Sequence, residues 1–461
     1  MKNKAEALQE QKRKAGIDPE EAKKKASPDD LSDIECHYDC AGKNYWLKNS
    51  RGKWIPATET HVRRELKILG YRDWDLNRKL SEIHLSRDVK FAGAVAGHRT
   101  GILKSADGDI LVTSEPKLID PVKGEWPTIR EFLESLFSEY NQIDYVYSWL
   151  KCSVQALRDG RLSAPAQALV IVGESSDGKS CFQYAIVTDL LGGRHAPPNR
   201  YINGNEFNGA LTEAEHLLCE DPVPRTDMRS RLHLGSKVKE IVANETQSSH
   251  SKGKQEVKVN PFWRLTITMN SETENLMLLP PMSSDLENKI ILLKSTRATN
   301  LPDGDEGKAE FGRMIKSELP AFAHFLLNEY EIPESIKCPK GRYGVTHFHH
   351  PELIAHLHES SPESRLDIII QSVLFSKDGA SPYDDKWTGK AIDLERKLRD
   401  SPTWSHEVGQ ITRYHNAFGK YLARLTKNDK SKDRYSVRTI KGHSVYTITK
   451  DPVVVTDKVP F

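Results

Sequence analysis

A stretch of eight residues, 173–180, has the residue types that bind the phosphates of a nucleotide. It reads Gly-Glu-Ser-Ser-Asp-Gly-Lys-Ser. Glycines at its two ends allow backbone angles at which successive N–H groups turn toward one anion. Lys179 would reach the β and γ phosphates, and the hydroxyl of Ser180 would be a ligand of Mg²⁺. The stretch therefore predicts a site for ATP and Mg²⁺. The residues expected to contact the cofactor are consecutive: Gly173, Glu174, Ser175, Ser176, Asp177, Gly178, Lys179, Ser180 and Cys181.

The elements expected on either side of this loop are those that its chemistry requires. The apolar run 168–172 precedes the loop and predicts a strand, and residues 179–191 predict a helix. A helix directs the positive end of its dipole at an anion that lies before its first turn. An ordinary strand-to-helix turn is the alternative, and it would share the pattern without binding a nucleotide.

Two adjacent carboxylates follow a second apolar run. Residues 216–219 predict a short strand, and Glu220 and Asp221 come directly after it. Beside a phosphate loop, one such carboxylate can hold Mg²⁺ and the other can polarise the attacking water. The spacing does not decide which acid has which task. A surface turn closed by Pro222 is the structural alternative.

A polar amide ends a third apolar run. Residues 263–269 predict another strand, which Asn270 follows. An amide in this position can hydrogen-bond both the γ phosphate and the attacking water, and so sense which nucleotide is bound. Asn also ends many strands for structural reasons alone.

A basic hairpin is predicted between these last two strands. Residues 248–259 place a glycine between two lysines, with alternating apolar residues after them. Lys252, Lys254 and His250 could grip a phosphate backbone at the tip of this hairpin. A solvated, charged tip is the alternative.

The order of these elements resembles that of the superfamily 3 helicases, which are compact AAA+ motors of viruses, phages and mobile elements. The likeness is closest to the poxvirus-type and phage-type primase-helicase branch and covers roughly residues 150–300. It implies an ATP-dependent DNA helicase or translocase that acts in replication. The family forms rings, usually hexamers, that bind ATP between neighbours and place their hairpins in a central channel holding single-stranded DNA. A separate primase or polymerase would be a partner.

The resemblance also implies roles for individual residues. The catalytic set would be Lys179, Glu220, Asp221, Asn270 and Lys289. The metal ligands would be Ser180, Glu220 and Asp221, and the DNA-gripping residues would be His250, Lys252 and Lys254.

The sequence departs from the family at the positive residue that one subunit supplies to its neighbour's ATP. The family usually has arginine there, whereas the matching position here is Lys289. Lysine is a point charge without the two-pronged geometry of arginine. Arg297, or one of three upstream arginines, could hold the role instead: Arg225, Arg229 and Arg231.

Two other classes of protein remain open at this stage. A packaging motor or a nucleotide-dependent switch would share the loop and the acids, but would not need a hairpin and a sensor in this order. A binding module with a degenerate loop would hydrolyse no ATP. DNA-stimulated hydrolysis separates these classes from a translocase.

Composition favours a soluble protein in a reducing compartment. Of 461 residues, 37% are hydrophobic and 29% are charged, and no apolar run approaches the ~20 residues of a membrane span. We expect a phage or mobile-element protein in the bacterial cytoplasm, without a signal peptide. The six cysteines suggest no disulfide framework. Cys36, His37 and Cys40 offer at most three zinc ligands, so zinc is not expected.

The expected fold class is α/β: an AAA+ phosphate-loop core with a small N-terminal α+β region and a C-terminal winged-helix domain. We expect the chain to have four parts. They are a charged arm (1–30), a small N-terminal domain (31–125), the ATPase domain (126–345, with a helical lead-in at 126–165) and a basic C-terminal domain (346–461). The last domain has ten Lys or Arg against three acids between residues 401 and 450. This excess favours a nucleic-acid partner, with duplex DNA at the winged helix.

Overall fold

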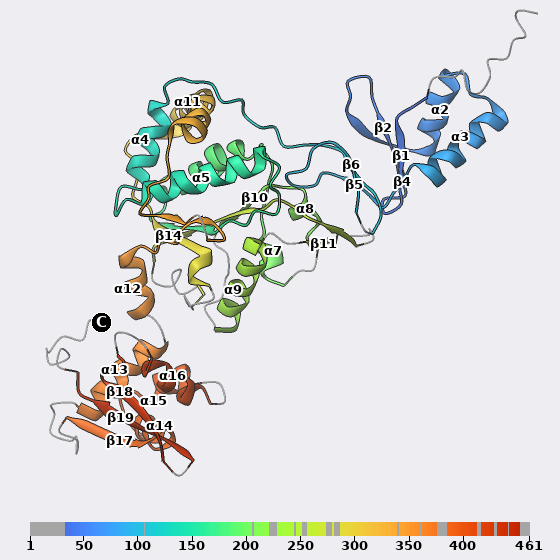
Figure 1. Cartoon of the computed structure of the whole chain (residues 1–461). Helices are drawn as coiled ribbons and strands as arrows, with labels where there is room; N and C mark the ends of the chain where they lie inside the picture. The colour runs from blue at the N-terminus through green and yellow to red at the C-terminus, as the bar shows by residue number, and fades with distance from the viewer. Residues whose placement is uncertain are drawn as a thin grey trace, which may run out of the picture.

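The structure is a computed structural model of the chain (Figure 1). It describes residues 33–105, 107–204, 207–220, 228–243, 246–250, 256–272, 279–280, 286–338, 341–359, 362–375, 385–412, 416–427, 431–440 and 442–451, with the backbone alone at 73, 228–230, 232, 358 and 359. The expected arm at 1–30 lies outside these ranges. Within them, no helix is long and apolar enough to cross a membrane.

A five-stranded sheet forms the centre of the fold. Its strand order is β14–β8–β13–β10–β9, and all neighbours are parallel. The strands are β8 (Ala168–Gly173), β9 (His195–Ala196), β10 (His216–Glu220), β13 (Arg264–Asn270) and β14 (Ile290–Lys294). Because the strands are parallel, their carboxyl ends meet at one edge, where ligands of such sheets bind. The three strands predicted at 168–172, 216–219 and 263–269 are confirmed.

Helices cover both faces of this sheet, and β8, which lies between β14 and β13, is apolar throughout. Leu169 and Ile171 of β8 pack into one hydrophobic core, and Val170 and Val172 pack into the other. The first core also contains α4 (Pro127–Leu136), α5 (Gln142–Arg158), α11 (Gly304–His324) and η5 (Phe325–Glu329). The second contains α7 (Asn199–Ile202), α8 (Gly209–Thr212) and α9 (Met228–Ala243). Figure 1 shows α5 and α9 on opposite sides of the sheet.

Two expected helices are interrupted. The expected helical lead-in at 126–165 contains two helices, α4 and α5, and Tyr140 and Asn141 between them have φ angles of 51° and 55°. The region 179–191 begins with one short α-helical turn, α6 (Lys179–Cys181), and continues as a π-helix, η3 (Phe182–Thr188). The helical character expected of the lead-in is confirmed, and the residues with positive φ divide it into two helices, because such residues end a right-handed helix.

The N-terminal domain contains a β-β-α unit, in which α2 follows β2 and β3. Its sheet has the order β3–β2–β1–β4, with α2 and α3 packed on one face. A second small sheet has the order β5–β7–β6. The elements are β1 (Cys36–Asp39), β2 (Asn44–Lys48), β3 (Trp54–Ala57), α2 (Glu59–Ile68), α3 (Asp73–Ser86), β4 (Asp88–Val89), β5 (Phe91–Gly93), β6 (Gly101–Leu103) and β7 (Ile110–Val112).

The C-terminal domain has its own hydrophobic core, around Leu366, Phe418 and Ile448. Its antiparallel sheet has the order β17–β19–β18, and Gly442, with φ +77°, lies between β18 and β19. Two helices, α15 and α16, precede β18. The elements are α13 (Pro362–Phe375), β17 (Lys386–Lys390), α14 (Ala391–Arg399), α15 (Ser405–Ile411), α16 (Ala417–Leu425), β18 (Tyr435–Ile440) and β19 (His443–Thr449).

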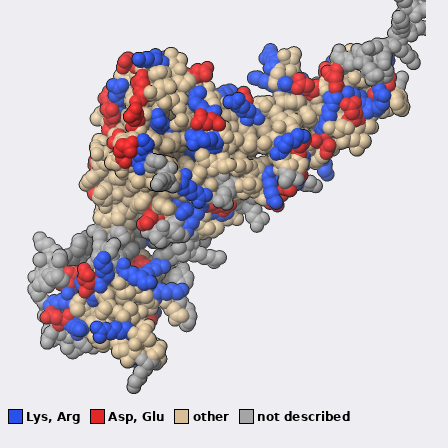
Figure 2. Space-filling model, viewed as in Figure 1, with Lys and Arg blue, Asp and Glu red and all other residues tan. Residues whose placement is uncertain are grey.

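Short elements complete the chain between these parts. They are β11 (Gln247–Ser249), β12 (Val257–Val259), η4 (Glu287–Lys289), β15 (Lys337–Cys338), β16 (Gly344–Val345) and α12 (Pro351–Glu359). On the face seen in Figure 2, basic and acidic side chains are mixed over the central domain.

Candidate active site

The loop after β8 can be built only with glycines at its two ends. Gly178 has φ +119°, and a Cβ there would lie 2.9 Å from Cε2 of Phe132. A Cβ on Gly173 would lie 2.1 Å from Oγ of Ser295. Both distances are below those that real Cβ atoms show, so any other residue would displace the loop.

Lys179 lies inside this loop, with 7% of its surface exposed. Its Nζ donates hydrogen bonds to the carbonyls of Gly173 (2.8 Å) and Glu174 (2.6 Å). It also lies 3.1 Å from Oδ1 of Asp177. The ammonium group is therefore held at the centre of the loop, where a phosphate would compete for it with two neutral carbonyls and one carboxylate.

Asp177 braces the loop from beneath. It is buried, and its carboxylate accepts hydrogen bonds from the backbone N–H of Lys179 (3.1 Å) and from the hydroxyl of Ser295. Its carbonyl accepts a hydrogen bond from the N–H of Ala298 (3.0 Å). These bonds fix the loop to the segment after β14. The side chain of Asp177 thus holds the loop's shape rather than pointing toward a ligand.

A hydroxyl and a carboxylate meet beside the loop. The Oγ of Ser180 donates a hydrogen bond of 2.8 Å to Oε1 of Glu220, at the carboxyl end of β10. The two oxygen atoms are of the kind that coordinate a hard cation such as Mg²⁺. Asp221, the second predicted acid, lies outside the described residues.

Asn270 ends β13 next to the loop. In the sheet register it pairs with Gly173, so the amide lies at the same edge as Lys179 and Glu220. The following residue, Ser271, donates a hydrogen bond of 2.5 Å to Glu174. The structure therefore brings the loop, the acid-ended strand and the amide-ended strand together.

These groups line a cleft of about 870 Å³. One wall is the loop from Ser175 to Cys181, with Glu220 and residues 268–270. Apart from Arg297, sequence reasoning missed the other wall, which comes from the segment after β14 and from α11. It is apolar at Leu301, Pro302 and Phe311, and it carries Lys308 and the ion pair of Arg297 with Asp303 (3.3 Å). No spacing pattern links these residues to the loop, because tertiary folding alone brings them there.

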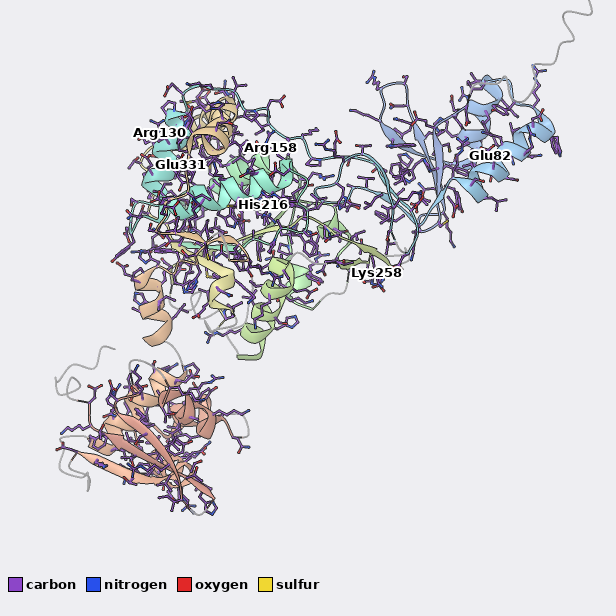
Figure 3. The ribbon with its side chains drawn as sticks, in the orientation of Figure 1. Glu82, Arg130, Arg158, His216, Lys258 and Glu331 are labelled. Atoms are coloured by element: carbon purple, nitrogen blue, oxygen red, sulfur yellow. The ribbon has the colours of Figure 1, made fainter. Side chains whose placement is uncertain are left out.

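A chain of hydrogen bonds in the core ends at this cleft. Thr268, which lines the cleft, donates to Oε1 of Gln183 on η3 (3.2 Å), and Nε2 of Gln183 donates to Oγ1 of Thr266 (2.7 Å). His216 of β10 lies between Thr266 and Thr188, at 2.7 Å from each hydroxyl oxygen. Figure 3 labels His216 in the central domain.

The donors and acceptors of this chain fix the tautomer of His216. The hydroxyl of Thr188 donates to the carbonyl of Gln183 (3.0 Å), so it must accept from Nδ1–H of His216. The hydroxyl of Thr266 already accepts from Gln183, so its proton is directed at Nε2. Burial, together with the smaller effect of nearby His195, lowers the pKa of His216 to about 3. The imidazole is therefore neutral at neutral pH.

The structure places the residues expected to act on a neighbour's nucleotide in three different settings. Lys289 precedes Ile290, which pairs with Ala168, so it lies roughly 20 Å along the strands from Gly173, at about 3.3 Å per residue. It cannot contact the nucleotide of its own chain. Arg297 lines its own cleft, and Arg231 is buried with Nε donating to the carbonyl of Leu279 (2.8 Å). Arg225 and the side chain of Arg229 lie outside the described residues.

The structure describes the base of the predicted hairpin. Strands β11 and β12 pair antiparallel, with Gln247 opposite Val259. The backbone N–H of His250 donates to Oδ1 of Asn208 (2.8 Å), and its ring lies 4.8 Å from that of Phe207. Lys252 and Lys254, at the tip, lie outside the described residues.

The cysteines near the N-terminus do not form a metal site in the described structure. Cys36 and His37 are successive strand residues and point to opposite faces of the sheet. Burial raises the pKa of the Cys36 thiol to about 12, and the Sγ of Cys40 lies 3.9 Å from Asp88. Elsewhere, Glu139, His350 and Glu352 come within 4.8 Å of one another, but Lys294 lies between the two carboxylates.

Comparisons with known proteins agree with this architecture. A family described as "Family of unknown function (DUF5906)" matches residues 171–284, which contain the loop, both acid and amide strand ends and the hairpin. No curated protein matches the sequence.

Solved structures match over most of the chain. The apo structure of the NrS-1 C-terminal region (305–718) is 14% identical with a TM-score of 0.53, over 91% of this chain and 96% of that one. The A form apo structure of the same region is 12% identical with the same TM-score. The X-ray structure of JCV helicase is 16% identical, covers 53% of this chain and 61% of that one, and has a TM-score of 0.28. The chain therefore shares the mixed α/β fold, with its parallel sheet, of the NrS-1 C-terminal region.

Proposed function

We propose that this chain is an ATP-dependent DNA helicase or translocase. The observation that carries the proposal is the convergence of three groups at one sheet edge: the phosphate loop, the Ser180–Glu220 pair and Asn270. A hairpin with a basic tip sequence rises from the same domain, between the strands that carry the acid and the amide. A nucleotide site coupled to a basic element is what DNA translocation requires.

The proposed nucleotide site fits ATP with Mg²⁺. The loop has the glycine geometry that a phosphate cradle needs, and the ammonium of Lys179 lies within it. The apolar wall at Leu301, Pro302 and Phe311 would cover the base, and Arg297 and Lys308 would face the negative phosphates. When bound, Mg²⁺ would neutralise charge on the phosphates. Ser180 and Glu220, with Asp221, would be its protein ligands.

The remaining groups have proposed tasks in hydrolysis. Glu220 or Asp221 would take the proton of the attacking water, and the amide of Asn270 would orient that water by a hydrogen bond. Lys179 would hold the transferred phosphoryl group through its charge. Buried Asp177 keeps the loop in place while Lys179 moves between the carbonyls and the phosphate.

We further propose a ring, most simply a hexamer, with Lys289 acting on a neighbour's ATP. Lys289 and the cleft lie at opposite ends of the parallel strands, so Lys289 would have to reach the cleft of another subunit, as head-to-tail packing in a ring allows. The C-terminal domain would add a winged-helix contact with duplex DNA. Its helices precede the β18–β19 hairpin, and its sequence has an excess of basic residues. A primase or polymerase would be a separate protein.

ATP hydrolysis with and without single-stranded DNA tests the proposal. We expect wild type to hydrolyse ATP faster with DNA, and Lys179→Ala to hydrolyse none while folding normally. Lys67→Ala, on the exposed side of α2, is the matched control and should behave as wild type. Hydrolysis indifferent to DNA would instead indicate a packaging motor or a switch, and no hydrolysis by wild type would indicate a binding module.

A hairpin variant tests the coupling to DNA. Lys252→Ala combined with Lys254→Ala should keep basal hydrolysis and lose its stimulation by DNA. Normal unwinding by this double variant would refute the proposed grip.

A further inference from the structure

One face of β13 carries three polar side chains. Thr266, Thr268 and Asn270 alternate along the strand with apolar residues that pack into the second hydrophobic core. The polar side chains therefore lie on the other face of the sheet, where Gln183 of η3 hydrogen-bonds the two threonines. Thr268 lines the cleft, although only 4% of its surface is exposed. Its hydroxyl is thus a group of the cleft with a fixed partner behind it.

Thr268 is the neighbour of Glu220 across the sheet. The two residues are partners in the parallel register of β13 and β10, and adjacent strands lie about 4.8 Å apart. Leu217 and Cys219 of β10 pack into the second core, so Glu220 points to the same face as Thr268. Ser180 donates its hydrogen bond to Oε1 of Glu220 on this side. The hydroxyl of Thr268 therefore lies where the two expected ligands of Mg²⁺ meet.

The direction of each hydrogen bond behind Thr268 is set at the far end of the chain of bonds. The main-chain carbonyl of Gln183 can only accept, so the hydroxyl of Thr188 donates to it (3.0 Å). That hydroxyl accepts from Nδ1–H of His216, and the neutral imidazole accepts at Nε2 from the hydroxyl of Thr266. The oxygen of Thr266 in turn accepts from the amide N–H of Gln183 (2.7 Å). The amide oxygen of Gln183 therefore faces Thr268.

This order of donors and acceptors leaves Thr268 one role toward the cleft. Its only proton goes to Oε1 of Gln183 (3.2 Å), so its oxygen can act toward the cleft only as an acceptor. No donor in the described part of the chain bonds to that oxygen. The order also protects Glu220, because a hydroxyl proton free to turn toward its carboxylate would compete with a cation.

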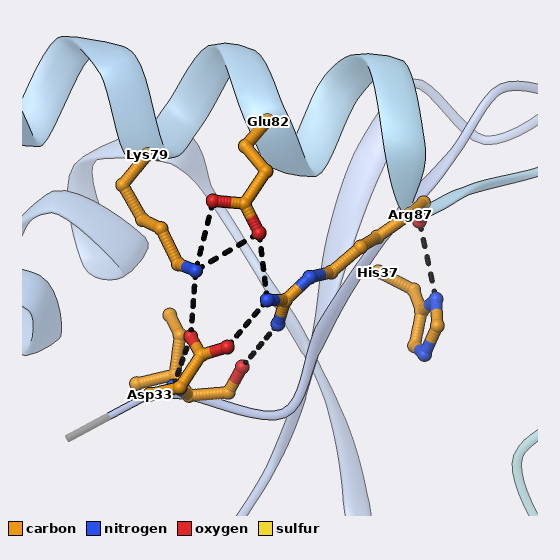
Figure 4. A network of polar contacts seen from close by, with 6 residues as sticks. Asp33, His37, Lys79, Glu82 and Arg87 are labelled. Atoms are coloured by element: carbon orange, nitrogen blue, oxygen red, sulfur yellow. Dashed lines mark hydrogen bonds and ion pairs between the residues drawn. The ribbon is translucent and has the colours of Figure 1, made fainter. Parts of the chain in front are cut away.

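A polar network in the N-terminal domain has the opposite character (Figure 4). Glu82 binds Nζ of Lys79 (2.9 Å) and the guanidinium of Arg87 (2.8 Å), and Asp33 binds the same two cations. Its charged groups satisfy one another. The network behind Thr268 is instead neutral, and it ends at a group that faces the cleft.

We propose that Thr268 is a positioning residue for Mg²⁺, and that Gln183 keeps its hydroxyl in the accepting direction. Mg²⁺ retains several of its waters when it binds to a protein, and the protons of those waters need acceptors. The oxygen of Thr268, beside Ser180 and Glu220, would accept one of these hydrogen bonds. The inference rests on the nucleotide site of the proposed function, but it does not depend on hydrolysis or on DNA.

Calorimetry with a non-hydrolysable ATP analogue and the full chain tests this role. The readout is the ratio of Kd in EDTA to Kd in Mg²⁺, which a loss of stability alone does not change in folded protein. We expect Thr268→Val to reduce this ratio by about 2- to 10-fold, the effect of one lost hydrogen bond, and to leave Kd in EDTA unchanged. Thr268→Ser keeps the hydroxyl and should keep the wild-type ratio.

A second variant tests the direction of the hydroxyl. Gln183→Met removes the amide oxygen that accepts from Thr268 and keeps a side chain of similar length. The ratio should fall as it does in Thr268→Val. The double variant should show no further fall, because the two residues act as one unit. A purely structural role for Gln183 would lower stability and leave the ratio unchanged.

Two variants outside the cleft are controls. Thr412→Val removes the hydroxyl of a buried threonine in the C-terminal domain. Glu82→Gln weakens the charged network of the N-terminal domain. Both should keep the wild-type ratio, whatever stability they lose.

The outcomes separate this role from the motor. An unchanged ratio in both Thr268→Val and Gln183→Met would overturn the inference. So would a Thr268→Val variant that binds the analogue equally weakly with Mg²⁺ and with EDTA, since its hydroxyl would then serve the nucleotide directly. Wild-type binding that Mg²⁺ does not change would overturn it as well. If the wild type binds the analogue but hydrolyses no ATP, the motor assignment fails, whereas the ratio still decides the role of Thr268.

Discussion

The buried His216 predicts that the core loses stability in acid. Its side chain is fully buried between Thr188 and Thr266, and burial lowers its pKa from about 6.5 to about 3. The unfolded chain therefore binds a proton below pH 6.5 that the folded chain does not bind until pH 3. The unfolded state binds more protons in this window, so the free energy of unfolding falls as the pH falls.

The size of the effect follows from the shift. One proton corresponds to about 1.4 kcal/mol per pH unit, so about 2 kcal/mol should be lost between pH 6.5 and pH 5. The His216→Gln variant has one amide donor for Thr188 and one oxygen acceptor for Thr266, and it does not titrate. We expect its free energy of unfolding to fall by about 2 kcal/mol less than that of wild type over this range.

This difference can be measured by urea unfolding at pH 7 and pH 5. Hydrogen exchange in peptides from β8 and β13 is the readout, so the measurement reports on the core domain alone. His443→Gln, at an exposed position of β19, is the control for loss of a histidine. Equal pH dependence in wild type and His216→Gln would refute the buried neutral imidazole. If the free energy of unfolding of the wild type rose as the pH fell, the predicted direction of the pH effect would be wrong.

Three further predictions concern the cleft. Gly178→Ala and Gly193→Ala both place a Cβ at positive φ, which costs about 1–2 kcal/mol, but only Gly178→Ala also contacts Phe132. Thermal unfolding should show the larger loss for Gly178→Ala, and calorimetry should show that it alone weakens ATP binding. Ser180→Ala should raise the Mg²⁺ concentration needed for half-maximal hydrolysis, and an unchanged Mg²⁺ titration would contradict its assignment. Arg297→Ala should raise the Kd of ATP for an isolated subunit, measured by calorimetry, whereas a residue acting only on a neighbour would leave nucleotide binding by a monomer unchanged.

The parts of the site that sequence could predict are those encoded locally. Loop residues 173–180 follow their strand directly, and the strand ends at Glu220 and Asn270 could be read from apolar runs that stop at a polar residue. Their meeting at one edge then follows from parallel pairing. The apolar wall at Leu301 and Phe311 could not be predicted, because it forms only when α11 packs over the loop.

The interrupted helices were missed for a related reason. α4 and α5 bury their apolar faces in the same core, so hydrophobic periodicity continues across the break at Tyr140 and Asn141. Asn tolerates a left-handed backbone, but the sequence gives no sign that it adopts one here. Alternation along β2 separates Trp46 from Tyr45, but only the structure shows which face the helices cover.

The most direct test of the central claim is the rate of ATP hydrolysis by wild type and Lys179→Ala, each with and without single-stranded DNA. The same samples would be sized by light scattering with a non-hydrolysable ATP analogue. The account predicts hydrolysis that DNA stimulates, none in Lys179→Ala, and a ring-sized assembly. Hydrolysis at the same rate with and without DNA, from a protein that stays monomeric, would contradict it.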